Sequence, residues 1–158
     1  MTGEDFARRV TELTPVMYRI CYMQLRTSAD REDAVQEAIF RAWEKRGTLR
    51  HEEYFNSWLI RILLNVCHDI QKRQKRVTPV ETLPESAATP DDGQARLRDA
   101  LFELDEKLRT PVILHYIDGY SVREVARIMD ISENAVKLRM LRGRKKLREL
   151  LTEEVFEE

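Results

Sequence analysis

Residues 120–147 constrain the fold of this chain most, because YSVREVARIMDISENAVKLRMLRGRKKL predicts two short helices joined by a tight turn. The first helix should begin just after Ser121, since Ser121 and Glu124 form a Ser-x-x-Glu capping box that satisfies backbone N–H groups of the first turn. The turn is predicted at 130–132, where Ser132 can cap the second helix. Two helices connected in this way are typical of a helix-turn-helix that reads duplex DNA.

Both of these helices carry an apolar stripe at helical spacing. The predicted buried positions are Val122, Val125, Ala126 and Met129 on the first helix and Val136, Met140, Gly143 and Leu147 on the second. The side chains left outside on the second helix are mostly basic or polar, and they make the candidate DNA contacts Asn134, Lys137, Leu138, Arg139, Arg142 and Arg144. An ordinary helical hairpin with a solvated basic face is the alternative interpretation of this segment.

The positive charge of the chain is concentrated in two segments, although 27 Lys and Arg against 28 Asp and Glu give a net charge of only −1. Residues 56–77 contain five basic residues and one acidic residue, and residues 133–150 contain seven basic and two acidic residues. The intervening residues 78–110 and the end of the chain, 151–158, are each acidic by four charges. Two separate basic segments predict phosphate contacts at two places, each of them sensitive to salt.

The composition also divides the chain. Residues 77–94 contain three prolines and lack helical apolar periodicity, so we interpret them as a flexible linker. No run of alternating apolar residues predicts a strand on either side of it. We therefore expect an all-α protein with small helical domains at 1–76 and 95–151, followed by an acidic tail at 152–158.

Three helical patterns fill the first domain. The first has an apolar stripe interrupted by Pro15, which can shift or kink the helix, and the stripe consists of Phe6, Val10, Leu13, Met17, Ile20 and Cys21. The second covers about 30–46, with Gly47 placed to end it in a left-handed conformation, and its apolar set is Ala34, Val35, Ala38, Ala42 and Trp43. The third covers about 53–76, with an apolar face of Phe55, Trp58, Leu59, Ile62, Leu63, Val66 and Ile70.

Polar side chains follow the other faces of the second and third helices. On the second helix they are Asp33, Gln36, Glu37 and Arg41, for which plain solvation is an equal alternative to a binding surface. On the third they are Asn56, Arg61, Asn65, His68, Lys72 and Arg73, a row of donors suited to phosphates and to the edges of unstacked bases. Trp58 is interpreted as a core residue, and the loop 47–53 is a place where a flipped-out base could enter.

Several other classes of protein are disfavoured. No signal peptide or membrane-spanning run is present, because Arg61 and Asn65 break the longest apolar stretches, so we expect a cytoplasmic protein without membrane insertion. Cys21 and Cys67 are expected to be free, buried thiols. We expect no cofactor, no metal site and no enzymatic activity, because the spacing of the histidines and cysteines matches no zinc pattern and no catalytic constellation is present.

The residues also carry a resemblance to a known family that covers nearly the whole chain. DREDAVQEAIFRAW and FNSWLIRILLNVCHDIQKR resemble region two of the extracytoplasmic-function sigma factors of the sigma-70 family, and residues 101–151 resemble their region four. The resemblance implies a specificity subunit of RNA polymerase, which leaves the chemistry to the polymerase. In that family region two binds the clamp helices of the polymerase and opens the minus-ten promoter element, while region four reads the minus-thirty-five element as duplex.

The resemblance also implies residue roles. The positions that match the family's polymerase-binding helix are Asp33, Gln36, Glu37 and Phe40, with Arg41 beside them. On the third helix the family's Asn, Asp and Arg correspond to Asn65, Asp69 and Arg73, and the DNA-binding set there is Asn56, Arg61, Asn65, Lys72 and Arg73. The chain departs from the family at Asn56, where a basic residue is common. In the recognition helix it departs at Ala135, Leu138 and Gly143. Leu138 can contact a thymine methyl or pack against the neighbouring helix.

The partners implied by the resemblance are core RNA polymerase, promoter DNA and an anti-sigma factor that covers the binding faces. A stand-alone helix-turn-helix regulator is the alternative function. It explains residues 120–147 but leaves the row of donors on the third helix without a use.

Overall fold

The structure is a computed structural model that describes residues 1–76 and 92–156, and every regular element in these two ranges is a helix. The chain divides into two compact units, residues 1–83 and 84–158. This confirms the predicted all-α fold with two small helical domains. Residues 77–91 of the predicted linker lie outside the described residues.

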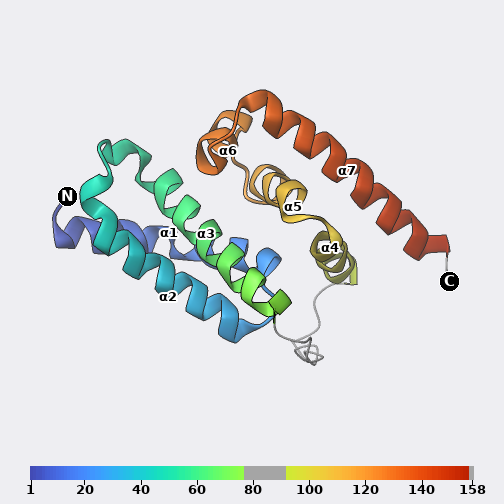
Figure 1. The fold of residues 1–158 in the computed structure, drawn as a ribbon, viewed down its shortest axis with the longest axis horizontal. Coiled ribbons are helices and arrows are strands. Elements are labelled where there is room, and N and C mark those ends of the chain that lie inside the picture. Colours follow the sequence, from blue (N-terminus) through green and yellow to red (C-terminus); the bar gives the residue numbers. More distant parts are fainter. Residues whose placement is uncertain (77–91, 157–158) are drawn as a thin grey trace. The chain divides into compact units, whose positions relative to one another are not determined.

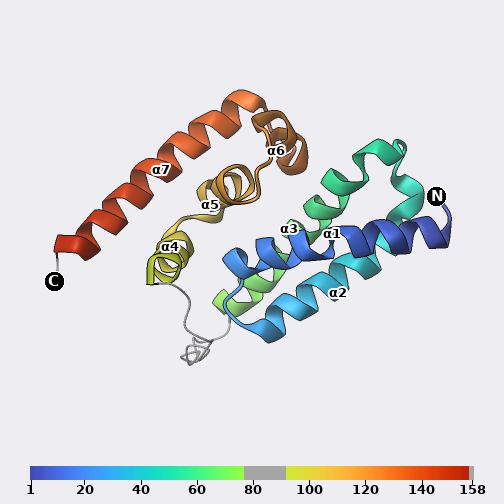
Figure 2. The same cartoon turned by 180° about the vertical axis from the view of Figure 1, so that it is seen from behind.

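Three long helices build the first unit, and Figure 2 shows α1 in front of the other two. They are α1 (Gly3–Gln24), α2 (Ser28–Lys45) and α3 (Phe55–Arg76), with the single 3₁₀ turns η1 (Arg46–Thr48) and η2 (Glu52–Tyr54) between the last two. Each of the three helices packs against the other two. The whole predicted stripe of α1 is buried, and the helix continues through Pro15, which lies at an exposed position.

The end of α2 differs from the prediction. Gly47 does not take the left-handed conformation, which among the described glycines belongs to Gly119 with φ of +78°. The chain instead tightens into η1, where the Leu49 N–H donates to the Arg46 carbonyl at 3.3 Å. The Arg46 guanidinium lies 3.6 Å from the ring centroid of Trp43, and this contact accompanies the tightened turn. Trp43 itself is not enclosed, because 39% of it is exposed at the edge of the unit.

The buried arc of α3 is wider than the predicted stripe. Phe55, Leu59, Leu63, Val66 and Ile70 are buried as predicted, and Ile60 and Cys67 are buried too. The predicted core residues Trp58 and Ile62 are only half-buried. The reason is that α3 packs against α1 and α2 at once, so two adjoining stripes of the helix are covered.

The described part of the second unit, residues 92–156, consists of four α-helices and one π-helical turn, and Figure 1 labels the α-helices. They are α4 (Asp92–Glu103), α5 (Glu106–Val112), η3 (Ile113–Ile117), α6 (Val122–Met129) and α7 (Glu133–Phe156). The helices α4, α5 and α6 all pack against α7. Because α4 begins at residue 92 and α7 ends at 156, the predicted boundaries at 94 and 151 both fall inside helices. Helix ends are the least certain part of a prediction from the periodicity of apolar residues.

The helix-turn-helix forms as predicted. The Ser121 Oγ accepts from the Glu124 N–H at 3.1 Å, and the Glu124 carboxylate accepts from the Ser121 N–H at 3.2 Å. The turn contains Asp130 in the left-handed conformation, with φ of 56°. Ser132 caps α7 by accepting from the Ala135 N–H at 3.1 Å. The buried residues of α6 are Val125, Ala126 and Ile128, whereas the predicted Val122 and Met129 are half-buried.

Gly143 allows α7 to approach α5 closely. The predicted stripe of α7, which is Val136, Met140, Gly143 and Leu147, is buried throughout. A Cβ added to Gly143 would lie 2.9 Å from Val112 Cγ2 and 3.2 Å from the Leu108 carbonyl oxygen. Both distances are shorter than ordinary van der Waals contact, so the missing side chain is a packing requirement. It offsets the cost of glycine in a helix, which is about 1 kcal/mol relative to alanine.

We therefore expect Gly143→Ala to destabilise the second unit, because overpacking costs about 1–3 kcal/mol and outweighs the gain in helix propensity. Amide hydrogen exchange of α7 measures the second unit separately from the first. In a Val112→Ala background, which removes the closest atom, Gly143→Ala should destabilise the second unit less. Gly47→Ala is the matched control, since a Cβ at Gly47 meets nothing within 4 Å. Slower exchange in Gly143→Ala alone would contradict this account.

Candidate functional site

The outer face of α2 carries the predicted polymerase-binding residues. Asp33, Gln36, Glu37 and Phe40 recur at steps of three, one and three, and all are exposed, opposite the buried Ala34, Ala38 and Ala42. Phe40 is 56% exposed, although its ring is among the largest apolar groups of the unit. A face of carboxylates around an exposed aromatic ring suits a basic protein surface that has an apolar centre.

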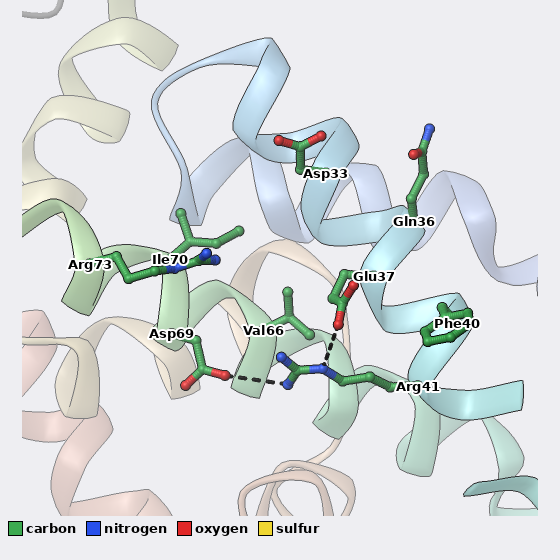
Figure 3. Close-up of a pocket in the computed structure, with 9 residues that line it drawn as sticks. All are labelled: Asp33, Gln36, Glu37, Phe40, Arg41, Val66, Asp69, Ile70 and Arg73. Carbon is green, nitrogen blue, oxygen red and sulfur yellow. Dashed lines mark hydrogen bonds and ion pairs between the residues drawn. The ribbon is translucent and has the colours of Figure 1, made fainter. Parts of the chain in front are cut away.

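These residues border a groove of about 690 Å³ between α2 and α3 (Figure 3). The groove also brings in residues from α3 that are distant in sequence, and its lining is Asp33, Gln36, Glu37, Phe40, Arg41, Val66, Asp69, Ile70 and Arg73. All five predicted polymerase-binding residues therefore line the same groove as Arg73 of the predicted DNA-binding set. Asp69, which the sequence resemblance matched without giving it a role, lies in the same groove.

Arg41 connects the two walls of the groove. Its Nε donates to Glu37 Oε1 at 3.0 Å, and its Nη1 donates to Asp69 Oδ2 at 3.3 Å, as Figure 3 shows. Hydrogen bonding to Glu37, more than the burial that opposes it, holds the pKa of the Arg41 guanidinium above its usual value. The side chain is 33% exposed, whereas Glu37 and Asp69 are about half exposed. Pairs of this kind contribute about 0.2–1 kcal/mol each.

The donors on α3 separate into two groups. Arg61, Asn65, His68 and Lys72 follow one another at steps of four, three and four, so they form a single row along the helix. Arg73 lies to the side of that row, in the groove beside α2. Asn56 belongs to the first turn of α3 and lies five residues before Arg61, which places it off the row. The structure therefore does not bring Asn56 together with the other predicted DNA-binding residues.

The loop before α3 is held by α1. The Arg9 Nη1 donates to the Glu52 carbonyl at 2.8 Å, and the Arg9 guanidinium carbon lies 5.7 Å from the ring centroid of Phe55. The rings of His51 and Tyr54 meet edge to face at 6.1 Å and are exposed. These two aromatic rings were not among the predicted site residues. A signal for them was available in the sequence, because His51 lies in the loop 47–53 where a base could enter and Tyr54 directly follows that loop.

The basic side chains of α7 lie on two flanks of the helix. Lys137 and Arg144 are seven residues apart and share one flank, while Arg139 and Arg142 are three apart and share the other. Between the flanks lie Asn134 and Leu138, together with Leu141, which the sequence analysis missed. Leu138 is 47% exposed and Leu141 is 56% exposed, and for Leu138 this exposure favours contact with DNA over packing, the two roles that its sequence left open.

This arrangement fits a helix lying in a major groove, where the central face meets base edges and the flanks meet the phosphate backbones. Arg144 is also near an aromatic ring of η3, because its guanidinium carbon lies 5.8 Å from the ring centroid of Tyr116. The two leucines on the central face offer apolar contact to thymine methyl groups.

The remaining candidate groups are dispersed. Within residues 1–76 and 92–152, no cluster of three or more His, Cys, Asp and Glu side chains is arranged to hold a metal ion. Cys21 and Cys67 are both buried, with their sulfur atoms 3.8 Å apart. His115 donates from Nδ1 to the Tyr120 carbonyl at 2.7 Å. None of the described helices combines the length and the hydropathy that crossing a bilayer requires.

The comparisons with known proteins agree with this geometry. The family model for sigma-70 region 2 matches residues 9–77, and the model for sigma-70 region 4 matches residues 94–147. The chain is 33% identical to the ECF RNA polymerase sigma factor SigM of Mycobacterium tuberculosis, over 85% of this chain and 71% of SigM. It is 31% identical to the RNA polymerase sigma factor SigV of Bacillus subtilis, over 92% of this chain and 90% of SigV.

Solved structures show the same fold. CnrH, in complex with the cytosolic domain of CnrY, matches with a TM-score of 0.76 and 26% identity over 96% of this chain and 90% of that one. The sigma factor RpoE of Bartonella quintana, in complex with the anti-sigma factor NepR, matches with a TM-score of 0.75 and 24% identity over 94% of this chain and 98% of that one. The chain belongs to the sigma-70 family, in the extracytoplasmic-function group of RNA polymerase sigma factors.

Proposed function

We propose that this chain binds core RNA polymerase through the outer face of α2 and directs the enzyme to its promoters. The observation that carries the proposal is that region 2 and region 4 follow one another on one chain, each on its own compact unit. A stand-alone helix-turn-helix regulator would use α6 and α7 alone. It would leave the groove between α2 and α3 and the donor row of α3 without a function.

The three surfaces take different ligands. The acidic face of α2 with Phe40 suits a basic polymerase surface with an apolar centre, which in this family is the pair of clamp helices. The row Arg61, Asn65, His68 and Lys72 on α3 suits the opened minus-ten strand, because amide and basic donors reach both phosphates and exposed base edges. The outer face of α7 suits the minus-thirty-five duplex. The polymerase supplies the bond-forming chemistry, so no catalytic step is assigned to this chain.

An anti-sigma factor is the third partner. The solved relative RpoE is in complex with the anti-sigma factor NepR, and CnrH is in complex with the cytosolic domain of CnrY. A protein that covers α2 would prevent polymerase binding, and one that covers α7 would prevent duplex binding. The place of action is the cytoplasm, where the polymerase works.

The experiment that tests this function adds the purified chain to core bacterial RNA polymerase and maps transcript starts across a genomic DNA library. Discrete starts that depend on the chain are the expected result, and they deliver the promoter motif at the same time. Tight duplex binding by the chain alone, without any stimulated start, would replace the proposal with the stand-alone regulator.

We predict that Asp33→Lys weakens binding to core polymerase at least about fivefold, because it places a positive charge against a basic partner. Asp33 is preferred to Glu37 because Glu37 also holds Arg41. The affinity of the labelled chain for core polymerase is the measurement. Glu12→Lys is the matched control, since Glu12 is an exposed acid on α1 that pairs only at 3.6 Å with Arg8. Equal losses in both variants would mean that the effect is not specific to α2.

We predict that Arg139→Ala and Arg142→Ala each weaken binding of the chain to minus-thirty-five duplex and reduce its dependence on salt. Loss of one phosphate contact should lower the slope of log affinity against log salt by about 0.9. Titrations at several salt concentrations measure this slope. Arg96→Ala, an exposed arginine of α4, is the control and should leave the slope unchanged. An unchanged slope for both α7 variants would remove this flank from the duplex interface.

A further inference from the structure

Arg41 is the one described residue that bonds directly to both α2 and α3 inside the groove, through Glu37 and Asp69. Figure 3 shows the ring of Phe40 on the side of Arg41 that is away from Asp69. The guanidinium of Arg41 instead points along the groove toward the third helix. Two of its N–H groups donate within the protein, which leaves fewer guanidinium N–H groups to bind a partner.

Asp69 is a carboxylate on a helix that is otherwise basic. It lies four residues after Asn65, which belongs to the row assigned to the opened strand, and four before Arg73, so it lies between that row and the groove. Its side chain is 50% exposed. A negative charge at this position repels phosphates unless a cation neutralises it, and the cation within reach is Arg41 at 3.3 Å. The groove lining has three acids, Asp33, Glu37 and Asp69, against Arg41 and Arg73, so loss of Arg41 would leave one base against three acids.

We propose that Arg41 is a positioning residue for the opened promoter strand, which acts by neutralising and holding Asp69 rather than by contacting the polymerase. The inference rests on the proposed function, because it requires that α3 meets single-stranded DNA. It changes the role of Arg41, which the family resemblance placed beside the polymerase-binding residues.

A consequence is that the two partners are coupled through one guanidinium. A basic polymerase group that pairs with Glu37 competes with the Arg41 to Glu37 hydrogen bond. The guanidinium then pairs more completely with Asp69. Polymerase binding therefore favours the state in which the negative charge of Asp69 is neutralised on the side of α3 that meets DNA. Coupling of this kind is reciprocal: DNA bound at α3 strengthens polymerase binding at α2.

The test measures the affinity of single-stranded minus-ten DNA for the complex of core polymerase with a saturating amount of the chain, so that polymerase occupancy does not enter. Arg41→Gln should weaken this affinity about two- to fivefold, the range expected for one exposed ion pair. Adding Asp69→Asn to Arg41→Gln should restore it to within about twofold of the unsubstituted chain, because the uncompensated charge is then gone. Arg41→Lys should retain most of the affinity, since it keeps the charge.

A purely structural clamp predicts a different pattern. If Arg41 only held α2 to α3, removing Asp69 would break the same contact, and the double variant would be as weak as Arg41→Gln. That result would overturn the proposal, as would an Arg41→Gln variant with unchanged DNA affinity. Arg8→Gln is the matched control, because Arg8 also lies within 3.6 Å of two acids, Asp5 and Glu12, but on α1. Its DNA affinity should not change.

The outcome also separates this inference from the proposed function. If the unsubstituted chain gives polymerase no affinity for minus-ten DNA, the proposed function fails. If it gives that affinity and Arg41→Gln retains it in full, only the role of Arg41 fails.

Discussion

The small buried side chains of α2 set the arrangement on which the candidate site depends. Three of the four buried residues of this helix are alanines, Ala34, Ala38 and Ala42. Alanine at a crossing allows two helix axes to come closer than larger side chains do. Long polar side chains from one helix can then reach the next, and the Arg41 bridge to Asp69 spans two helices in this way. Gly143 has the same effect in the second unit, where it brings α7 against α5.

Local signals made much of the fold predictable from sequence. The capping box at Ser121, the cap at Ser132 and the full apolar stripes of α1 and α7 all follow from spacings within one helix. The failures come from elsewhere. The chain leaves α2 through the 3₁₀ turn η1, which the contact of Arg46 with Trp43 accompanies, and the residue type of Gly47 alone does not reveal such a contact. The buried arc of α3 depended on its two neighbours.

The candidate site was predictable as a set of residues and not as an arrangement. The sequence placed all five α2 positions on or beside one face, but it gave no indication that Arg41 turns toward α3. That orientation depends on how two helices pack, since Arg41 and Asp69 are 28 residues apart along the chain, and the periodicity within one helix does not predict that packing. Likewise, Leu141 was not predicted as a surface contact, because it is apolar and lies outside the buried stripe already assigned to this helix. Its exposure shows only when the packing of α7 is known.

The distribution of charge explains why such a chain would depend on the polymerase to find a promoter. Its net charge of −1 gives it little general attraction for DNA, and the two basic segments lie on separate units. Each segment offers only five or seven basic side chains, and their contacts with phosphates weaken as the salt concentration rises. Because both segments lie on one chain, binding of one raises the effective concentration of the other, and the polymerase raises it further where it holds the two at the spacing of the promoter elements. Weak elements that act together are therefore selective for DNA that offers both promoter sites, and they release DNA that offers one.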